Sequence, residues 1–169
     1  MVDLETPRMP ALGPLYNRGF YNNYLHGLDH LCERYVKKQT RILELGSYHG
    51  ASTRVFIEHS DRVTCVDIQQ YPQMNDILPA LEEFVISDSC DFLKSIEVGA
   101  YDLIYIDTTH EYQKTLEEVQ LSWEKLLPGQ FLSGHDYTHL GVHEALLHFF
   151  QYPKVNVFLD TSWLIEKTY

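Results

Sequence analysis

Two acids and two histidines stand directly after two short apolar segments in the second half of the chain. Asp107 ends one segment, with His110 three residues later, and His135 and Asp136 follow the next. The carboxylates of Asp107 and Asp136 are suited to hold Mg²⁺ or Mn²⁺, with water completing the coordination. Such an ion would lower the pKa of a substrate hydroxyl. In the metal-free alternative, His110 or His135 acts as general base, because an unperturbed imidazole titrates at about pH 6.5.

These residues are therefore candidates for two kinds of site. The candidate catalytic residues are Asp107, His110 and His135, and the candidate metal ligands are Asp107 and Asp136. Structural roles stay open for two of them. Asp107 could cap the helix that follows it, and His135 could be a buried histidine with satisfied hydrogen bonds.

A glycine-containing loop follows the first apolar run of the chain. Its sequence, ELGSYHGAST, places the glycines at Gly46 and Gly50. Gly46 allows a sharp turn after a strand because glycine adopts positive φ easily, and Gly50 allows close packing at a helix start. The spacing is neither the G-x-G-x-x-G of dinucleotide-binding folds nor a lysine-containing phosphate loop.

Two carboxylates accompany this loop. Asp67 stands 21 residues after Gly46, at the end of the next β-branched run, where a carboxylate suits the two hydroxyls of a ribose. Glu44 lies inside the first apolar run, and a buried carboxylate is rare unless it is paired. The ammonium and sulfonium of S-adenosylmethionine would pair with it, whereas a pyrophosphate would not. The structural alternative is a strand, loop and helix with an edge carboxylate.

Apolar runs that alternate with helical patterns predict a doubly wound α/β domain. Its strands pair in parallel with helices on both faces, and its ligand site lies beyond the carboxyl ends of the strands. We expect strands at Arg41–Leu45, Arg62–Asp67, Glu83–Ser87, Tyr101–Asp107 and Gln130–Ser133, a closing antiparallel hairpin at Val155–Leu159 and Trp163–Glu166, and helices at Leu25–Lys38, Thr53–His59, Ser89–Ile96, Tyr112–Leu127 and Val142–Phe150.

Composition narrows the class of protein. The chain has 169 residues, 13 Lys and Arg against 24 Asp and Glu, and a net charge of −11, which argues against a nucleic-acid partner. The absence of a long apolar run argues against a membrane span. The amino-terminal stretch lacks the features of a secretory signal, and three cysteines without metal-like spacing fit reduced thiols, so a cytoplasmic location is expected.

Taken together, the motifs resemble those of class I S-adenosylmethionine-dependent methyltransferases. The resemblance rests on Glu44, Gly46, Gly50 and Ser52, and on Asp67 at the end of the next strand. The stretches YDLIYIDTTHEY, LLPGQFLSGHDY and GVHEAL resemble the small-molecule O-methyltransferase branch, which includes macrocin-type and catechol-type enzymes. The resemblance implies a Rossmann-like methyltransferase fold, with a seven-stranded, mostly parallel sheet whose last strand is antiparallel.

The resemblance also implies where the cofactor S-adenosylmethionine binds. The glycine loop would pass beneath its amino-acid part, and Asp67 would take the ribose. Ile68 would pack on the adenine, whose edge Asp88 and Ser89 would face. Relatives usually have Gly where this chain has Thr108 and often a second acid where it has Thr109, so a metal on this turn stays open. The cofactor-binding residues implied are Glu44, Gly46, Ser47, Tyr48, Gly50, Ser52, Asp67, Ile68, Asp88, Ser89 and Asp107.

The expected function is transfer of a methyl group to a hydroxyl of a small-molecule acceptor. Residues 1–38 would form an aromatic segment and helix, with Tyr16–Tyr24 either as a lid or as a packing or dimerising element, and 39–169 the catalytic domain. A homodimer is one option for the assembly. The alternatives are an S-adenosylmethionine-binding protein without catalysis and a nicotinamide-dependent oxidoreductase, with methylation of amino groups or nucleic acid disfavoured by motif and charge.

Overall fold

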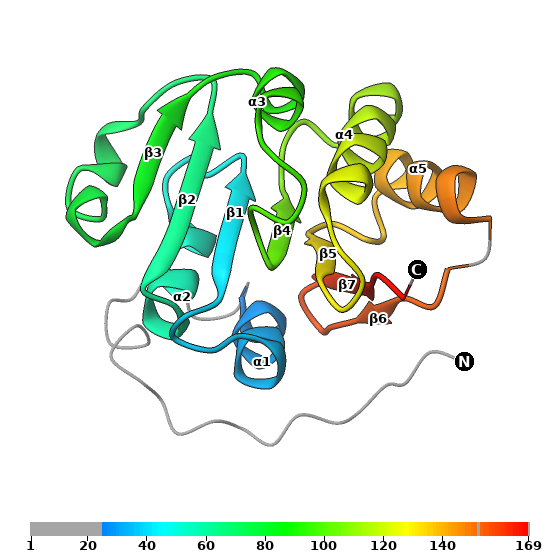
Figure 1. The fold of residues 1–169 in the computed structure, drawn as a ribbon, viewed down its shortest axis with the longest axis horizontal. Helices are drawn as coiled ribbons and strands as arrows, with labels where there is room; N and C mark the ends of the chain where they lie inside the picture. The colour runs from blue at the N-terminus through cyan, green and yellow to red at the C-terminus, as the bar shows by residue number, and fades with distance from the viewer. Residues whose placement is uncertain (1–24, 152, 169) are drawn as a thin grey trace.

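The computed structural model describes residues 25–151 and 153–168, and these form one seven-stranded sheet flanked by helices. The strand order is β3-β2-β1-β4-β5-β7-β6, which Figure 1 shows from left to right. The predicted fold class is confirmed. The strands are β1 (Arg41–Leu45), β2 (Arg62–Asp67), β3 (Glu83–Ile86), β4 (Leu103–Ile106), β5 (Phe131–Gly134), β6 (Asn156–Val157) and β7 (Trp163–Glu166).

The first five strands are parallel, and their register aligns their carboxyl ends. Leu45 of β1 lies opposite Val66 of β2 and Ile106 of β4, and Ile106 lies opposite Gly134 of β5. All four residues of β4 are buried, as expected for a central strand covered on both faces. The residues that follow these strands are therefore gathered at one edge of the sheet.

The last strand runs against the others. Phe131 of β5 pairs with Glu166 of β7, and Gly134 pairs with Trp163, in an antiparallel register. The closing hairpin forms as expected, but β6 is shorter than the predicted Val155–Leu159. The chain already turns at Phe158, whose amide donates to the carbonyl of Ser162 at 2.8 Å.

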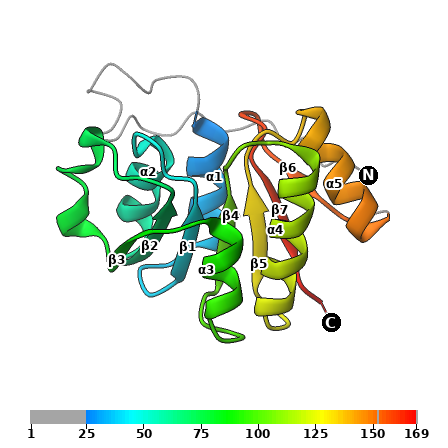
Figure 2. The same cartoon turned by 90° about the horizontal axis from the view of Figure 1, so that it is seen from above.

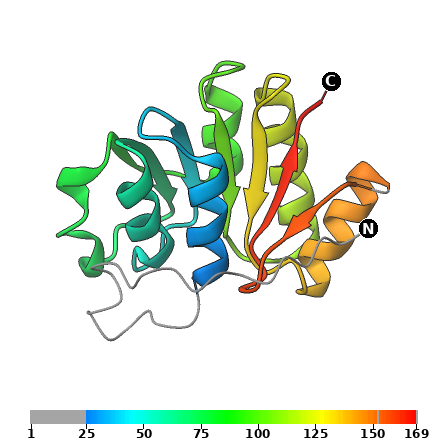
Figure 3. The ribbon, with the colours of Figure 1, turned by 90° about the horizontal axis from the view of Figure 1, so that it is seen from below.

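Helices cover both faces of the sheet, as Figures 2 and 3 show. α1 and α2 pack on one face around a core that includes Leu28 and Phe56, while α3, α4 and α5 pack on the other around Val119 and Leu146. None of the described helices is long and apolar enough to cross a membrane. The α-helices are α1 (His26–Tyr35), α2 (Ala51–His59), α3 (Ser89–Ser95), α4 (Tyr112–Lys125) and α5 (Leu140–Phe150), and two 3₁₀ turns, Pro72–Met74 and Leu78–Ala80, lie between β2 and β3.

α1 packs into the same core as the sheet. Leu28 and Leu31 are fully buried, and the amide of Leu28 donates to the Asp160 carboxylate of the β6–β7 turn at 2.8 Å. The predicted lid, Tyr16–Tyr24, lies outside the described residues. The division into 1–38 and 39–169 stays a prediction.

Candidate active site

The loop after β1 lies directly against the turn after β4. Gly46 has φ +86°, and a Cβ placed there would lie 2.2 Å from the carbonyl oxygen of Asp107. Only glycine therefore fits this position without moving one of the two chains. Gly50 has φ +80° and begins α2, with the side chains of Ile77 and Met74 filling the space beside it. The structure thus supports the turn and close-packing roles predicted for both glycines.

Glu44 lies beneath this loop, in the interior. It is fully buried, and its carboxylate accepts hydrogen bonds from the hydroxyl of Ser52, from the hydroxyl of Thr53 at 2.6 Å and from the thiol of Cys65 at 3.1 Å. Burial raises the pKa of Glu44 to about 7, and the three hydrogen bonds oppose that rise. The sequence predicted a cationic partner for Glu44, whereas the structure surrounds it with neutral donors.

A hydroxyl near a helix start usually caps backbone amides, but those of Ser52 and Thr53 have a different role. They bind Glu44 and do not cap the amides of α2, which has no side-chain cap. Ser47, in the loop itself, is 3% exposed, and its Oγ has no hydrogen-bond partner among the described residues. An unpartnered buried hydroxyl is unfavourable, so this atom fits a polar group of a ligand over the loop.

Asp67 faces the glycine loop from the end of β2. The amide of Tyr48 donates to its Oδ2 at 2.8 Å, so the predicted ribose-binding acid and the loop are joined directly. Ile68 follows and is 72% exposed. Such exposure of a large aliphatic side chain agrees with its predicted packing against an adenine. The ring of Tyr48 stacks on His49 and meets Tyr71 edge-on, at centroid distances of 3.6 and 4.7 Å.

Asp88 and Ser89 lie where β3 leads into α3. One oxygen of Asp88 accepts from the amides of Cys90 and Asp91, at 2.9 and 3.2 Å, and the other pairs with Lys114 at 2.7 Å. The Lys114 ammonium lowers the pKa of Asp88, although partial burial opposes this. Both carboxylate oxygens thus have partners within the chain, and Asp88 caps α3.

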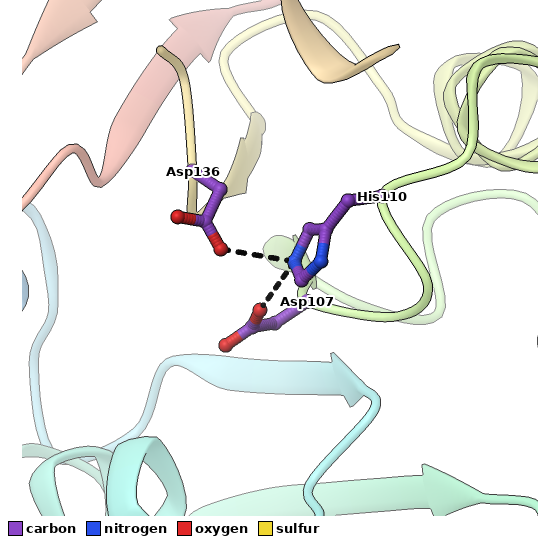
Figure 4. Close-up of side chains that lie close together, drawn as sticks. All are labelled: Asp107, His110 and Asp136. Atoms are coloured by element: carbon purple, nitrogen blue, oxygen red, sulfur yellow. Dashed lines mark hydrogen bonds and ion pairs between the residues drawn. The ribbon is translucent and has the colours of Figure 1, made fainter. Parts of the chain in front are cut away.

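The acids and one of the histidines predicted at the ends of β4 and β5 come together (Figure 4). Nε2 of His110 lies 3.1 Å from Oδ1 of Asp107 and 3.1 Å from Oδ2 of Asp136. The hydrogen bond with Asp107 raises the pKa of His110, which partial burial opposes. His110 and Asp136 have left-handed backbones, with φ 60° and 54°, a conformation in which non-glycine residues are strained.

The second predicted histidine lies beside this group. Nδ1 of His135 lies 3.3 Å from Oδ2 of Asp136, and its Nε2 is buried without a partner among the described residues. Within the described residues, His135 is therefore not the buried histidine with satisfied hydrogen bonds that the structural alternative expects. His139, which was not predicted for the site, has its ring centroid 5.6 Å from that of His110.

Three glycines lie against the backbone of residues 106–110, which leads from the end of β4 into the turn that carries His110. Gly46 abuts the carbonyl of Asp107, as described above, and a Cβ on Gly134 of β5 would lie 2.5 Å from the carbonyl oxygen of Ile106. A Cβ on Gly141 of α5 would lie 2.2 Å from the carbonyl oxygen of His110. The turn is thus enclosed by backbone, which fixes the position of its side chains.

The acid and histidine group also fits a metal ion. Asp107, His110 and Asp136 offer ligand atoms that all lie within 4.8 Å of one another, and no other group of this kind occurs in the part of the chain that the structure describes. Carboxylate oxygens suit Mg²⁺ and Mn²⁺, and imidazole suits transition metals. The donor set thus agrees with the predicted ligands Asp107 and Asp136.

The fold and this site define a class of protein. A sheet of order 3-2-1-4-5-7-6 with a reversed β7, whose glycine loop after β1 faces an acid at the end of β2, is the Rossmann-like fold of class I methyltransferases. A family model for a methyltransferase domain matches residues 43–137, more than half of the chain. The chain belongs to this family of S-adenosylmethionine-dependent methyltransferases.

Solved structures share the fold at low identity. An rRNA methylase from Streptococcus thermophilus superposes with a TM-score of 0.65 at 14% identity, over 86% of this chain and 97% of that chain. The N-methyltransferase NodS from Bradyrhizobium japonicum gives 0.60 at 15% identity, over 88% and 98%. The MycE methyltransferase of the mycinamycin biosynthetic pathway, in complex with Mg and SAH, gives 0.68 at 17% identity, over 95% of this chain and 54% of that chain. No curated protein matches the chain.

Proposed function

We propose that this methyltransferase acts on a hydroxyl group of a small molecule and that His110 is its general base. The observation that carries the proposal is the position of Nε2 of His110 between the carboxylates of Asp107 and Asp136, 3.1 Å from each. O-methylation releases the proton of the acceptor hydroxyl, so a base beside the acceptor is required.

The two carboxylates also favour one tautomer of the neutral His110 imidazole. Because the carboxylate oxygens beside Nε2 can accept but not donate, the proton of neutral His110 is placed on Nε2, and Nδ1 keeps its lone pair. Nδ1 is then the atom that accepts the hydroxyl proton, and the carboxylates stabilise the imidazolium that forms. Asp107 and Asp136 act here through His110, which they orient.

The cofactor part of the proposal rests on the glycine loop. S-adenosylmethionine supplies an electrophilic methyl group on its sulfonium. Asp67 would bind the ribose, Ile68 would cover the adenine, and Ser47 Oγ would donate to or accept from the amino-acid part. The unpartnered hydroxyl of Ser47 and the exposed side chain of Ile68 support this placement. The backbone of the loop, held by its glycines, needs no reorganisation to receive it.

A metal ion has a defined place in this scheme. Asp107 and Asp136 would hold Mg²⁺ or Mn²⁺, and the ion would lower the pKa of the acceptor hydroxyl. His110 would then bind the ion through Nε2 or remain the base beside it. Metal binding is measurable without an acceptor, by calorimetry with Mn²⁺ on the wild type and on Asp136→Asn.

The test is a methyl-transfer assay over a panel of hydroxylated small molecules, with rRNA and amines as comparison acceptors. We expect transfer to a hydroxyl compound and loss of at least about a hundredfold in kcat for His110→Gln, as is usual for a general base. S-adenosylhomocysteine should bind that variant normally in calorimetry. Transfer only to rRNA or amines, or full activity of His110→Gln, would contradict the proposal.

The other functions considered have less support. The net charge of −11 disfavours a nucleic-acid acceptor because phosphate contacts require clustered basic residues. The methyltransferase family match, together with the absence of a G-x-G-x-x-G loop, leaves no observation in favour of a nicotinamide-dependent oxidoreductase. A cofactor-binding protein without catalysis would bind S-adenosylhomocysteine and transfer no methyl group, so the same assay distinguishes it. The cytoplasmic location stays a prediction, and a homodimer stays one option for the assembly.

A further inference from the structure

A second buried carboxylate, which the mechanism above does not use, lies in the middle of α4. Glu118 is fully buried. Its Oε1 accepts from the hydroxyl of Ser89 at 2.5 Å, and its Oε2 accepts from the hydroxyl of Thr108 at 2.7 Å. Burying a carboxylate is unfavourable unless both oxygens are satisfied, and here each oxygen has its own donor.

The two donors belong to different turns of the site. Ser89 begins α3, beside the turn predicted to face the adenine, and Thr108 directly follows Asp107 on the turn that carries His110. In the sheet, β3 and β4 are separated by β2 and β1, so no strand ladder joins these turns. Glu118 joins them by one hydrogen bond to each.

The surroundings of Glu118 strengthen the connection on the adenine side. Lys114, one helical turn earlier on α4, donates to Asp88 at 2.7 Å and to the thiol of Cys90 at 3.2 Å. α4 therefore holds the start of α3 at two levels, through Lys114 and through Glu118. The turn after β4 leads directly into α4, and the Glu118–Thr108 hydrogen bond adds a side-chain contact between them. Glu118 is thus the side chain that contacts both turns.

We propose that Glu118 is a positioning residue that links occupation of the nucleoside site to the placement of the Asp107–His110 turn. This inference rests on the proposed function, since it takes the adenine to lie beside Asp88 and Ser89. A ligand that orders the start of α3 fixes Ser89, Ser89 fixes the carboxylate, and the carboxylate fixes Thr108.

The experiment separates the two ends of the site by using adenosine, which has the nucleoside but no amino-acid part. The ¹⁵N signals of the His110 imidazole are recorded at one pH with and without saturating adenosine, and assigned by their loss in His110→Gln. In the wild type we expect the His110 signals to shift. In Glu118→Gln and in Ser89→Ala, most of that shift should be lost at saturation. Glu118→Gln should also bind S-adenosylhomocysteine about tenfold more weakly, as a lost hydrogen bond to a charged group predicts.

The matched control is Glu117→Gln, the same substitution one residue away. Glu117 is half-exposed and pairs with Lys94 on the surface. This variant should keep both the adenosine-induced shift and the affinity. A merely structural role for Glu118 would lower the unfolding temperature and leave the shift per bound adenosine unchanged.

The possible outcomes are distinct. If the wild type binds neither adenosine nor S-adenosylhomocysteine, the proposed function fails. If it binds both and the His110 signals do not respond, or if Glu118→Gln keeps the full response, the positioning role is overturned and the proposed function stands. Should Glu118→Gln fail to fold, Ser89→Ala and Thr108→Val each remove one hydroxyl from Glu118, and a full response in both would overturn the inference equally.

Discussion

Replacement of Glu44 by Gln offers the sharpest test of the electrostatics beneath the glycine loop. The Glu44 carboxylate is fully buried among the hydroxyls of Ser52 and Thr53 and the thiol of Cys65. Burial raises its pKa from the ordinary value of 4.5 to about 7. Because no solvent reaches the group, this rise translates directly into a pH dependence of the free energy of unfolding.

The sign follows from which state holds the proton. Below pH 4.5, Glu44 is protonated in both the folded and the unfolded chain. Between pH 4.5 and about 7 the folded chain keeps a proton that the unfolded chain releases, so stability falls as pH rises. Above that range both states are ionised and the effect is complete. A rise in pKa from 4.5 to about 7 corresponds to about 3 kcal/mol in the free energy of unfolding.

The assay is urea unfolding of the wild type and Glu44→Gln at pH 5 and pH 8. Gln does not titrate, and every other group is common to both proteins, so their difference isolates Glu44. We expect the stability of Glu44→Gln relative to the wild type to rise by about 2.5 kcal/mol from pH 5 to pH 8, since part of the effect is already present at pH 5. Glu117→Gln, which changes an exposed carboxylate, should show no such rise. A constant difference between the wild type and Glu44→Gln would refute the reasoning.

Three further substitutions test the site. Asp67→Ala should weaken S-adenosylhomocysteine binding at least about tenfold by calorimetry, since it removes a charged acceptor, and should leave the fold intact by circular dichroism. Gly46→Ala should destabilise the fold more than Gly129→Ala in urea unfolding. Both glycines have positive φ, for which Ala costs about 1–2 kcal/mol, but of the two only Gly46 would also place its Cβ against backbone, at 2.2 Å. Equal losses of stability would argue against that contact. Gly141→Ala should destabilise the fold by about 1–3 kcal/mol, because the new Cβ would meet the His110 carbonyl oxygen. Replacing Gly by Ala inside a helix usually stabilises it, so a gain in stability would show that the turn can move.

Much of the fold could be predicted from local patterns. The apolar run of β4 and the β-branched run of β2 are buried strands, and the predicted helix bounds differ from the observed ones by a few residues at most. The meeting of Asp107, His110 and Asp136 followed from one principle, because parallel neighbouring strands bring their carboxyl ends to one edge. β6 was predicted too long because the turn that begins at Phe158 depends on Ser162, four residues away.

The polar interior could not be predicted in the same way. Glu44 is conspicuous in the sequence as a carboxylate in an apolar run. Its partners, however, lie on the next helix and the next strand, and no spacing rule pairs a strand acid with those side chains. Glu118 gave less signal still. The helical spacing of Leu116, Val119, Trp123 and Leu126 indicates an apolar stripe on α4, whereas the buried residues of the helix also include Thr115, Glu118 and Ser122. Periodicity of apolar residues does not mark a face on which polar side chains bind one another.

The turn that carries His110 has a strained backbone, and its close surroundings hold it in place. His110 and Asp136 adopt a left-handed conformation that disfavours their side chains, and such strain persists only where the surroundings fix it. The close contacts of Gly46 and Gly141 with this turn leave no space for it to relax. A side chain at either glycine would displace the carbonyls of Asp107 or His110 by a large part of an ångström. In the proposed mechanism, these glycines would affect the rate by fixing the orientation of His110.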